Sequence, residues 1–131
     1  MVLDTSALLV ILLDEPDSPA FRQAIEVDPV RLLSAASLLE ASLVVEARFG
    51  EAGGRELDLL LHRAELEIVP VDRDQAEIGR EAFRRFGKGR HLAGLNFGDC
   101  FSYALSKLSG EPLLYRGNDF SRTDVTPALP A

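Results

Sequence analysis

Short apolar runs alternate along the chain with longer segments in which hydrophobic residues recur at helical spacing. The short runs predict buried strands at residues 2–3, 32–33, 66–71 and 112–115, and the pattern allows a fifth near Val125. The segments between them predict helices over residues 6–13, 19–27, 37–49, 54–65, 72–86 and 96–108. Strands that alternate with helices in this way are typical of a parallel sheet covered by helices on both faces.

Residues that favour helix ends mark several of these boundaries. Ser6 is expected to cap the first helix, and Ser37 with Glu40 forms the S-x-x-E pattern of a capping box. Asn96 is expected to cap the last long helix, and Gly110 follows it where a helix end favours glycine. Both the periodicity and the caps therefore indicate an alternating α/β order.

The predicted fold is α/β, a three-layer α/β/α arrangement with a central parallel sheet of four or five short strands. With 131 residues, 47% of them hydrophobic, the chain is long enough to bury a core and has the length of one domain. No internal repeat, low-complexity tract or flexible linker divides it. Residues 1–131 are therefore expected to form one domain.

Cysteine content and the length of the apolar runs bear on the cellular compartment. Cys100 is the only cysteine, so no internal disulfide can form, and a buried structural thiol is its expected role. Residues 7–13 are apolar but too few to span a membrane, and no basic segment precedes them as in a signal peptide. We therefore expect a cytoplasmic protein without membrane contact.

Four carboxylates lie close behind the predicted strands. Asp4 comes directly after the first strand and Asp119 shortly after the last, while Glu40 and Asp99 lie in the first turns of predicted helices. In an open parallel sheet, ligands bind beyond the carboxyl ends of the strands, so these four side chains are expected to meet at one edge. Carboxylates crowded together repel one another unless one is protonated or a cation binds.

The chemistry of this acidic cluster favours a hard divalent cation. Oxygen ligands without a nearby cluster of His or Cys select magnesium or manganese rather than zinc. A magnesium ion held there can activate water and stabilise the charge that develops during attack on a phosphodiester. Taken singly, three of the acids also have a structural explanation, since Glu40 and Asp99 fit capping positions and Asp119-Phe120 is a common turn pair. The expected convergence of all four is what favours a functional site.

A set of motifs in a fixed order resembles a PIN domain. The set comprises Val2-Leu3-Asp4-Thr5-Ser6-Ala7-Leu8, the helix that carries Glu40, Asn96-Phe97-Gly98-Asp99-Cys100 with Ala104 following, and Leu113-Leu114 with Asp119-Phe120. The resemblance covers residues 2–120 and is closest to the VapC toxins of bacterial VapBC toxin–antitoxin pairs. The opening D-T-S-A-L is moderately specific, whereas the ordered set with its spacing is strongly specific.

The resemblance implies a magnesium-dependent endoribonuclease, with Mn²⁺ as a substitute ion. Such a protein cleaves RNA, is neutralised by a small VapB-type antitoxin and is usually a homodimer. By the same match, Asp4 and Asp99 are the chief metal ligands, and Glu40 and Asp119 complete the acidic pocket through water or a second metal. Ser6 is implied to form hydrogen bonds within the site.

The chain departs from the family pattern at the end of the last strand. Many relatives place Thr, any residue, and then Asp or Asn there, where this chain has Tyr115-Arg116-Gly117. Gly117 supplies no side chain, so Asp119 is expected to serve as the fourth acid. Asp124 is its rival for that role.

The net charge of −7 is unfavourable for a protein that handles RNA, unless a local basic surface compensates. One dense basic run lies beside two glycines just before Asp99, and it could grip RNA phosphates or form an ordinary solvated loop. It consists of Arg84, Arg85, Lys88, Arg90 and His91. His62 and His91 lack metal-ligand spacing and are interpreted as surface residues.

Two other functions are compatible with an acid after a buried strand. In a haloacid-dehalogenase-like phosphatase Asp4 would be a nucleophile, but such a site needs a second Asp where Ser6 stands, and a nearby lysine. A non-catalytic receiver-like regulatory domain would need a phosphoacceptor Asp on a central strand and a downstream Lys. RNA cleavage that disappears in EDTA separates all three hypotheses.

Overall fold

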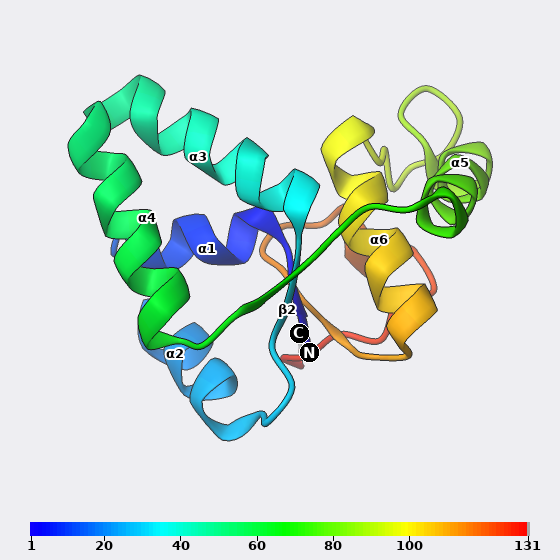
Figure 1. Ribbon diagram of the computed structural model, residues 1–131. Helices are drawn as coiled ribbons and strands as arrows, with labels where there is room; N and C mark the ends of the chain where they lie inside the picture. Colours follow the sequence, from blue (N-terminus) through cyan, green and yellow to red (C-terminus); the bar gives the residue numbers. More distant parts are fainter. Residues whose placement is uncertain (131) are drawn as a thin grey trace.

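The computed structural model of the chain describes residues 1–130 and consists of short strands connected by helices (Figure 1). The strands are β1 (Val2–Leu3), β2 (Leu32–Ser34), β3 (Glu67–Val69) and β4 (Leu113–Leu114). The helices are α1 (Thr5–Leu12), α2 (Ser18–Val27), α3 (Ala35–Phe49), α4 (Glu51–Arg63), α5 (Arg73–Phe86), α6 (Phe97–Ser109) and the short 3₁₀ helix η1 (Phe120–Arg122).

The strands form one parallel sheet in the order β3-β2-β1-β4. Val2 of β1 is in register with Leu32 on one side and Leu113 on the other. The predicted parallel sheet is thus confirmed with four strands, and the fifth strand near Val125 does not form. That segment makes only an isolated parallel bridge between Leu113 and Pro127, with hydrogen bonds from the Leu113 N to the Thr126 carbonyl and from the Ala128 N to the Leu113 carbonyl.

Alternating strand side chains divide the hydrophobic core between the two faces of the sheet. Leu3 and Leu114 pack with α1 to α4, whereas Val2 and Leu113 pack with α5, α6 and the C-terminal segment. Figure 1 shows α1 to α4 on one side of the strands and α5 and α6 on the other. This is the predicted three-layer arrangement, and it follows from the two-residue period of a strand.

The capping residues of two helices differ from the sequence prediction. The cap of α1 is Asp4, whose carboxylate accepts from the backbone N of Ser6 at 3.1 Å, so Ser6 lies inside the helix. The cap of α3 is Ser34 rather than Ser37, so the predicted Ser37–Glu40 capping box is wrong. In both cases the residue that ends or follows the strand already has the extended backbone of an N-cap, and the helix begins at once.

The start and end of α6 agree with the prediction. Asn96 and Asp99 form a reciprocal capping box, with 2.9 Å from the Asp99 backbone N to Asn96 Oδ1 and 3.0 Å from the Asn96 backbone N to Asp99 Oδ2. Gly110 ends the helix in the left-handed conformation, with φ +74°. None of the helices formed by residues 1–130 is both long and apolar enough to cross a membrane.

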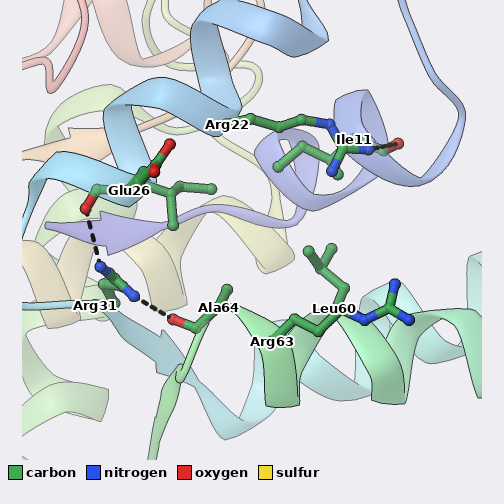
Figure 2. A pocket seen from close by; sticks show the side chains of 8 residues that line it. Ile11, Arg22, Glu26, Arg31, Leu60, Arg63 and Ala64 are labelled. Atoms are coloured by element: carbon green, nitrogen blue, oxygen red, sulfur yellow. Dashed lines mark hydrogen bonds between the residues drawn. The ribbon is translucent and has the colours of Figure 1, made fainter.

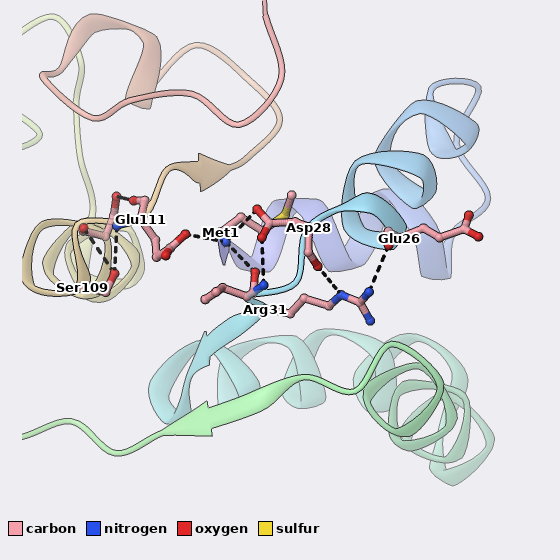
Figure 3. A network of polar contacts seen from close by, with 8 residues as sticks. Met1, Glu26, Asp28, Arg31, Ser109 and Glu111 are labelled. Carbon is pink, nitrogen blue, oxygen red and sulfur yellow. Dashed lines mark hydrogen bonds and ion pairs between the residues drawn. The ribbon is translucent and has the colours of Figure 1, made fainter.

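The amino end of β1 is held by a network of charged groups (Figure 3). The Met1 ammonium donates to Asp28 Oδ2 at 3.0 Å, to Glu111 Oε2 at 2.9 Å and to the Val30 carbonyl at 2.6 Å. Arg31 extends the network through hydrogen bonds to backbone carbonyls, including that of Asp28. The network joins the connection after α2 to the start of β4 through the first residue of the chain.

Candidate acidic active site

Asp4 lies at the carboxyl end of the central strand and is held on both of its oxygens. It is 5% exposed. Its Oδ1 accepts from Ser102 Oγ at 2.6 Å, and its Oδ2 accepts from Ser6 Oγ at 2.7 Å. Ser102 is itself buried and lies 3.3 Å from Ser37 Oγ. These hydroxyl groups fix the orientation of the carboxylate before any ligand binds.

Asp99 lies in the first turn of α6, close enough to Asp4 and Asp119 for the three charges to interact. Burial is the largest influence on its carboxyl group, and the negative charges of Asp4 and Asp119 act in the same direction, as does side-chain contact with Asp119. The hydrogen bond from the Asn96 backbone opposes them. Together these effects raise the pKa of Asp99 to about 7.

Glu40 and Asp119 approach the same helix start from two other segments. The Glu40 carboxylate lies directly against Gly98, so close that a Cβ on Gly98 would overlap Glu40 Oε2. Asp119 follows β4 and precedes η1. The structure therefore brings Asp4, Asp99 and Asp119 together and sets Glu40 beside them, while the catalytic role of the four stays a prediction.

Asp124, the rival for the fourth acid, lies in a different cluster. Its Oδ1 accepts from the Tyr103 hydroxyl at 2.7 Å, and its Oδ2 lies 3.1 Å from Lys107 Nζ and 3.4 Å from Arg85 Nη1. Burial acts to raise the pKa of Asp124, but the hydrogen bonds from Tyr103 and Lys107 and the nearby positive charges outweigh it and lower that pKa. Asp124 thus joins the C-terminal segment to α5 and α6, and Asp119 is the acid beside Asp99.

The donor set of the acidic cluster fits magnesium better than a metal that needs a full protein cage. All of the side-chain atoms that could bind a metal there are carboxylate and hydroxyl oxygens. Within residues 1–130, no group of three or more His, Cys, Asp or Glu side chains is placed ready to enclose a metal. Magnesium is usually held by one or two carboxylates and keeps several waters, so the two carboxylates of Asp4 and Asp99 are the residues that could hold it.

The basic run divides between the end of α5 and the loop that follows it. Arg84 pairs with Glu81 at 3.1 Å, and Arg85 pairs with Asp124, so both have carboxylate partners within the fold. Lys88 and Arg90 lie exposed in the loop before Asn96. The two residues of the run that lie in the loop, Lys88 and Arg90, are therefore the ones that precede the start of α6 in the chain.

The two histidines and the cysteine of the chain, His62, His91 and Cys100, do not lie in metal-binding surroundings. His62 and His91 are exposed, as predicted, and His91 Nδ1 accepts from the Ala93 backbone N at 3.0 Å within the loop. Cys100 is half-buried rather than fully buried, because it borders a cavity between α5 and α6, and burial raises the pKa of its thiol.

The sequence interpretation missed the second hydroxyl that holds Asp4. Ser102 lies three residues after Asp99, so both side chains project from one face of α6 toward the sheet edge. That spacing was a usable signal. The contact from Arg116 had no such signal: its backbone N donates to Ser6 Oγ at 3.0 Å, and only the fold brings the two together.

Comparison with known proteins identifies the family of the chain. The PIN domain family model matches residues 1–125. A VapC ribonuclease of Mycobacterium bovis is 62% identical over 131 residues, covering 99% of this chain and 100% of the relative, and a ribonuclease VapC of Mycolicibacterium smegmatis is 62% identical over 125 residues, covering 95% and 97%. The solved structure of Mycobacterium tuberculosis VapC20, a sarcin–ricin loop cleaving toxin, superposes with a TM-score of 0.77 at 18% identity and covers 95% of both chains. VapBC2 of Rickettsia felis, bound to promoter DNA, gives 0.75 at 17% identity, covering 96% of this chain and 94% of that one. The chain therefore belongs to the PIN-domain family and, within it, to the VapC ribonucleases.

Proposed function

We propose that this protein, acting as one domain, is a magnesium-dependent endoribonuclease and the toxin of a type II toxin–antitoxin pair. One observation carries the proposal: Asp4, Asp99 and Asp119 come from three separate segments and meet at the carboxyl edge of the sheet. No positively charged group among residues 1–130 pairs with them. The 62% identity to VapC ribonucleases over nearly the whole chain supports RNA as the substrate.

In this mechanism Asp4 and Asp99 hold the metal. A magnesium ion bound there supplies a Lewis acid and an activated water for attack on the phosphodiester. Ser6 and Ser102 keep the Asp4 carboxylate in one orientation through their bonds to its two oxygens. Such fixed positioning lowers the reorganisation needed during the reaction.

Glu40 and Asp119 act as the outer acids of the pocket. Asp119 lies beside Asp99, so it can accept a proton from attacking water or orient that water. Glu40 can do the same from the side of Gly98. Manganese has similar ligand preferences, and we expect it to replace magnesium.

The proposed partners are RNA, a VapB-type antitoxin and a second copy of the chain. The Rickettsia felis neighbour with its antitoxin supports the second. Two large apolar side chains near the start of α6 support the third, because Phe97 is 80% exposed and Leu92 is 83% exposed. Apolar groups this exposed are typical of interaction surfaces.

The basic run is proposed to contact RNA phosphates. Replacing the four cations with serine should weaken RNA binding and lower the slope of log affinity against log salt by up to about three on single-stranded RNA. The four are Arg84, Arg85, Lys88 and Arg90. An unchanged slope would assign the run to ordinary solvated surface.

The central test is cleavage of RNA by the purified protein with magnesium, with and without EDTA. Asp4→Asn and Asp99→Asn should abolish cleavage while the circular dichroism spectrum stays native. Asp58→Asn is the matched control, because Asp58 is exposed on α4 and should retain full activity. Asp119→Asn should lower activity and Asp124→Asn should not. Full cleavage by Asp99→Asn, or cleavage that persists in EDTA, contradicts the proposal.

A further inference from the structure

A cavity of about 360 Å³ lies beside the acidic pocket, between the start of α2 and the segment that follows β4. Its lining includes Asp17, Tyr115, Arg116 and Asn118. It joins the acidic pocket through the backbone, because the Arg116 N donates to Ser6 Oγ, and Ser6 Oγ in turn donates to Asp4. Its volume is in the range of small-ligand sites, which are roughly 300–1,000 Å³.

Arg116 is the one positively charged residue among the described residues that line this cavity. Its guanidinium lies 3.7 Å from Glu15 Oε1 and 3.7 Å from Asp17 Oδ2, beyond hydrogen-bonding distance in both cases. The side chain is about half exposed, at 47%, and ion pairs of this kind contribute little to stability. Arg116 can therefore exchange these partners for a ligand at small cost.

The turn after Arg116 keeps the cavity open. Gly117 has φ +105°, a conformation that other residues rarely adopt, and nothing lies within 4 Å of the place where its Cβ would be. The next residue, Asn118, is exposed, and it immediately precedes Asp119 of the acidic pocket. The departure of this chain at Gly117 thus has a backbone reason and leaves room beside the pocket.

We propose that this cavity binds the nucleotide next to the scissile phosphate, with Arg116 gripping its phosphate and the Asn118 amide facing its base. The proposal rests on the ribonuclease function proposed above. An arginine fork binds phosphate oxygens in pairs, and an amide offers both a donor and an acceptor to a base edge. RNA held this way would lie next to the acidic pocket, because Asn118 immediately precedes Asp119.

A second arginine-lined cavity provides the matched control (Figure 2). It lies between α1, α2 and α4, and Arg63 is one of its lining residues. Arg63 occupies the last turn of α4, just before β3 begins, and so lies toward the amino edge of the sheet. Arg63→Gln removes the same charge as Arg116→Gln at the edge opposite the acidic pocket.

The test measures binding of fluorescein-labelled random-sequence RNA in EDTA, in the non-cleaving Asp99→Asn background. Adding Arg116→Gln should raise Kd about tenfold and lower the salt slope by about 0.7, the contribution of one phosphate contact on a single strand. Arg116→Lys should keep the slope and recover part of the affinity. Adding Arg63→Gln should change neither quantity. Equal effects of Arg116→Gln and Arg63→Gln overturn the proposal.

A second variant keeps the proposal testable if Arg116→Gln fails to fold. Asn118→Ala removes an exposed side chain, and with magnesium it should shift the bases that flank the cut sites in a random RNA pool. Unchanged cut sites overturn the assignment of the cavity. If wild-type protein does not cleave RNA at all, the ribonuclease function itself fails, which is a different result from cleavage that is indifferent to both variants.

Discussion

The two ends of β1 both gather carboxylates, but only the amino end also contains a cation from the chain itself. There the Met1 ammonium contacts Asp28 and Glu111 at 3.0 and 2.9 Å (Figure 3). At the carboxyl end, Asp4 and Asp99 lie together, and no Lys, Arg or amino-terminal nitrogen among residues 1–130 comes within ion-pair distance of either.

The carboxyl pKa values move in opposite directions at the two ends. At the amino end burial acts to raise the pKa of Asp28, but the Val30 backbone hydrogen bond and the ammonium outweigh it and lower that pKa. At the other end burial and like charges raise the pKa of Asp99 to about 7. The comparison teaches that crowded carboxylates at the amino end are stabilised by a cation of the chain, whereas those at the carboxyl end have none among residues 1–130, which is why we propose that a metal binds there.

The largest expected effect comes from removing the charges at the amino end. Asp28→Asn with Glu111→Gln leaves the ammonium of Met1, a residue that is only 3% exposed, without a carboxylate. Removing the carboxylate partners of a buried charge costs about 3 kcal/mol of unfolding free energy. This loss is measurable by urea denaturation, as a lower midpoint with an unchanged m-value. Asp58→Asn with Glu56→Gln on exposed positions of α4 is the control. A loss no larger than the control's would mean that the network contributes nothing.

Adding a divalent cation that binds at the carboxyl end should raise the free energy of unfolding by nearly as much as the loss of the amino-end carboxylates lowers it. A metal that binds only the folded state adds about 2.7 kcal/mol at a hundredfold excess over its Kd. The melting temperature of the wild type should therefore rise by several degrees with magnesium or manganese, and Asp99→Asn should respond much less. Equal metal-induced shifts in the two proteins would mean that the ion binds elsewhere.

A smaller effect should follow from crowding Glu40. In Gly98→Ala the new Cβ overlaps the end of the flexible Glu40 side chain, which can move aside, so stability should change little. The displaced carboxylate should lower RNA cleavage about tenfold, a loss typical of general acid–base groups at the low end. Gly54→Ala is the matched control, because its Cβ would meet the Glu46 carboxylate at 3.1 Å on α3, outside the acidic pocket. Loss of activity in both variants alike would rule out a specific role for Glu40.

The smallest effect concerns pH in the metal-free protein. Folded Asp99 has a pKa of about 7, whereas in the unfolded chain the pKa of an aspartate is near its ordinary value of 3.8. The contribution of protonated Asp99 to the free energy of unfolding is therefore complete below about pH 4 and is lost as pH rises through 7. Relative to Asp99→Asn, the wild type should lose about 1 kcal/mol across that window, since partial exposure screens the charge. Asp28 acts oppositely: its stabilisation is present above the unfolded pKa and is lost as pH falls through its lowered folded pKa. Parallel stability curves for wild type and Asp99→Asn would contradict the assignment.

Most of the fold could be predicted because its signals are local. The paired apolar residues of β1 and β4 and the capping box at Asn96 are read directly from neighbouring positions. The start of α3 was mispredicted because Ser34, already extended as the last residue of β2, caps the helix before Ser37 is reached. The fifth strand that the pattern allowed near Val125 is reduced to a single bridge between Leu113 and Pro127.

Of the acidic site, only the features that follow from the order and direction of the strands could be predicted from the sequence. Parallel strands bring Asp4 and Asp119 to one edge whatever the details of packing. Contacts that depend on how distant segments pack gave no signal, such as the bond from the Arg116 backbone N to Ser6 Oγ and the approach of Glu40 to Gly98. Such contacts span up to 110 positions in the chain and arise only after folding.

The dual position of Asp4, as the cap of α1 and as a pocket acid, has a genetic consequence. Asparagine caps a helix as well as aspartate does, and the codons of the two amino acids differ by one base. A single point mutation at this codon should therefore silence the chemistry while the chain still folds to the same surface. An inactive gene copy of this kind would continue to produce a stable protein that competes with the active one for every shared binding partner.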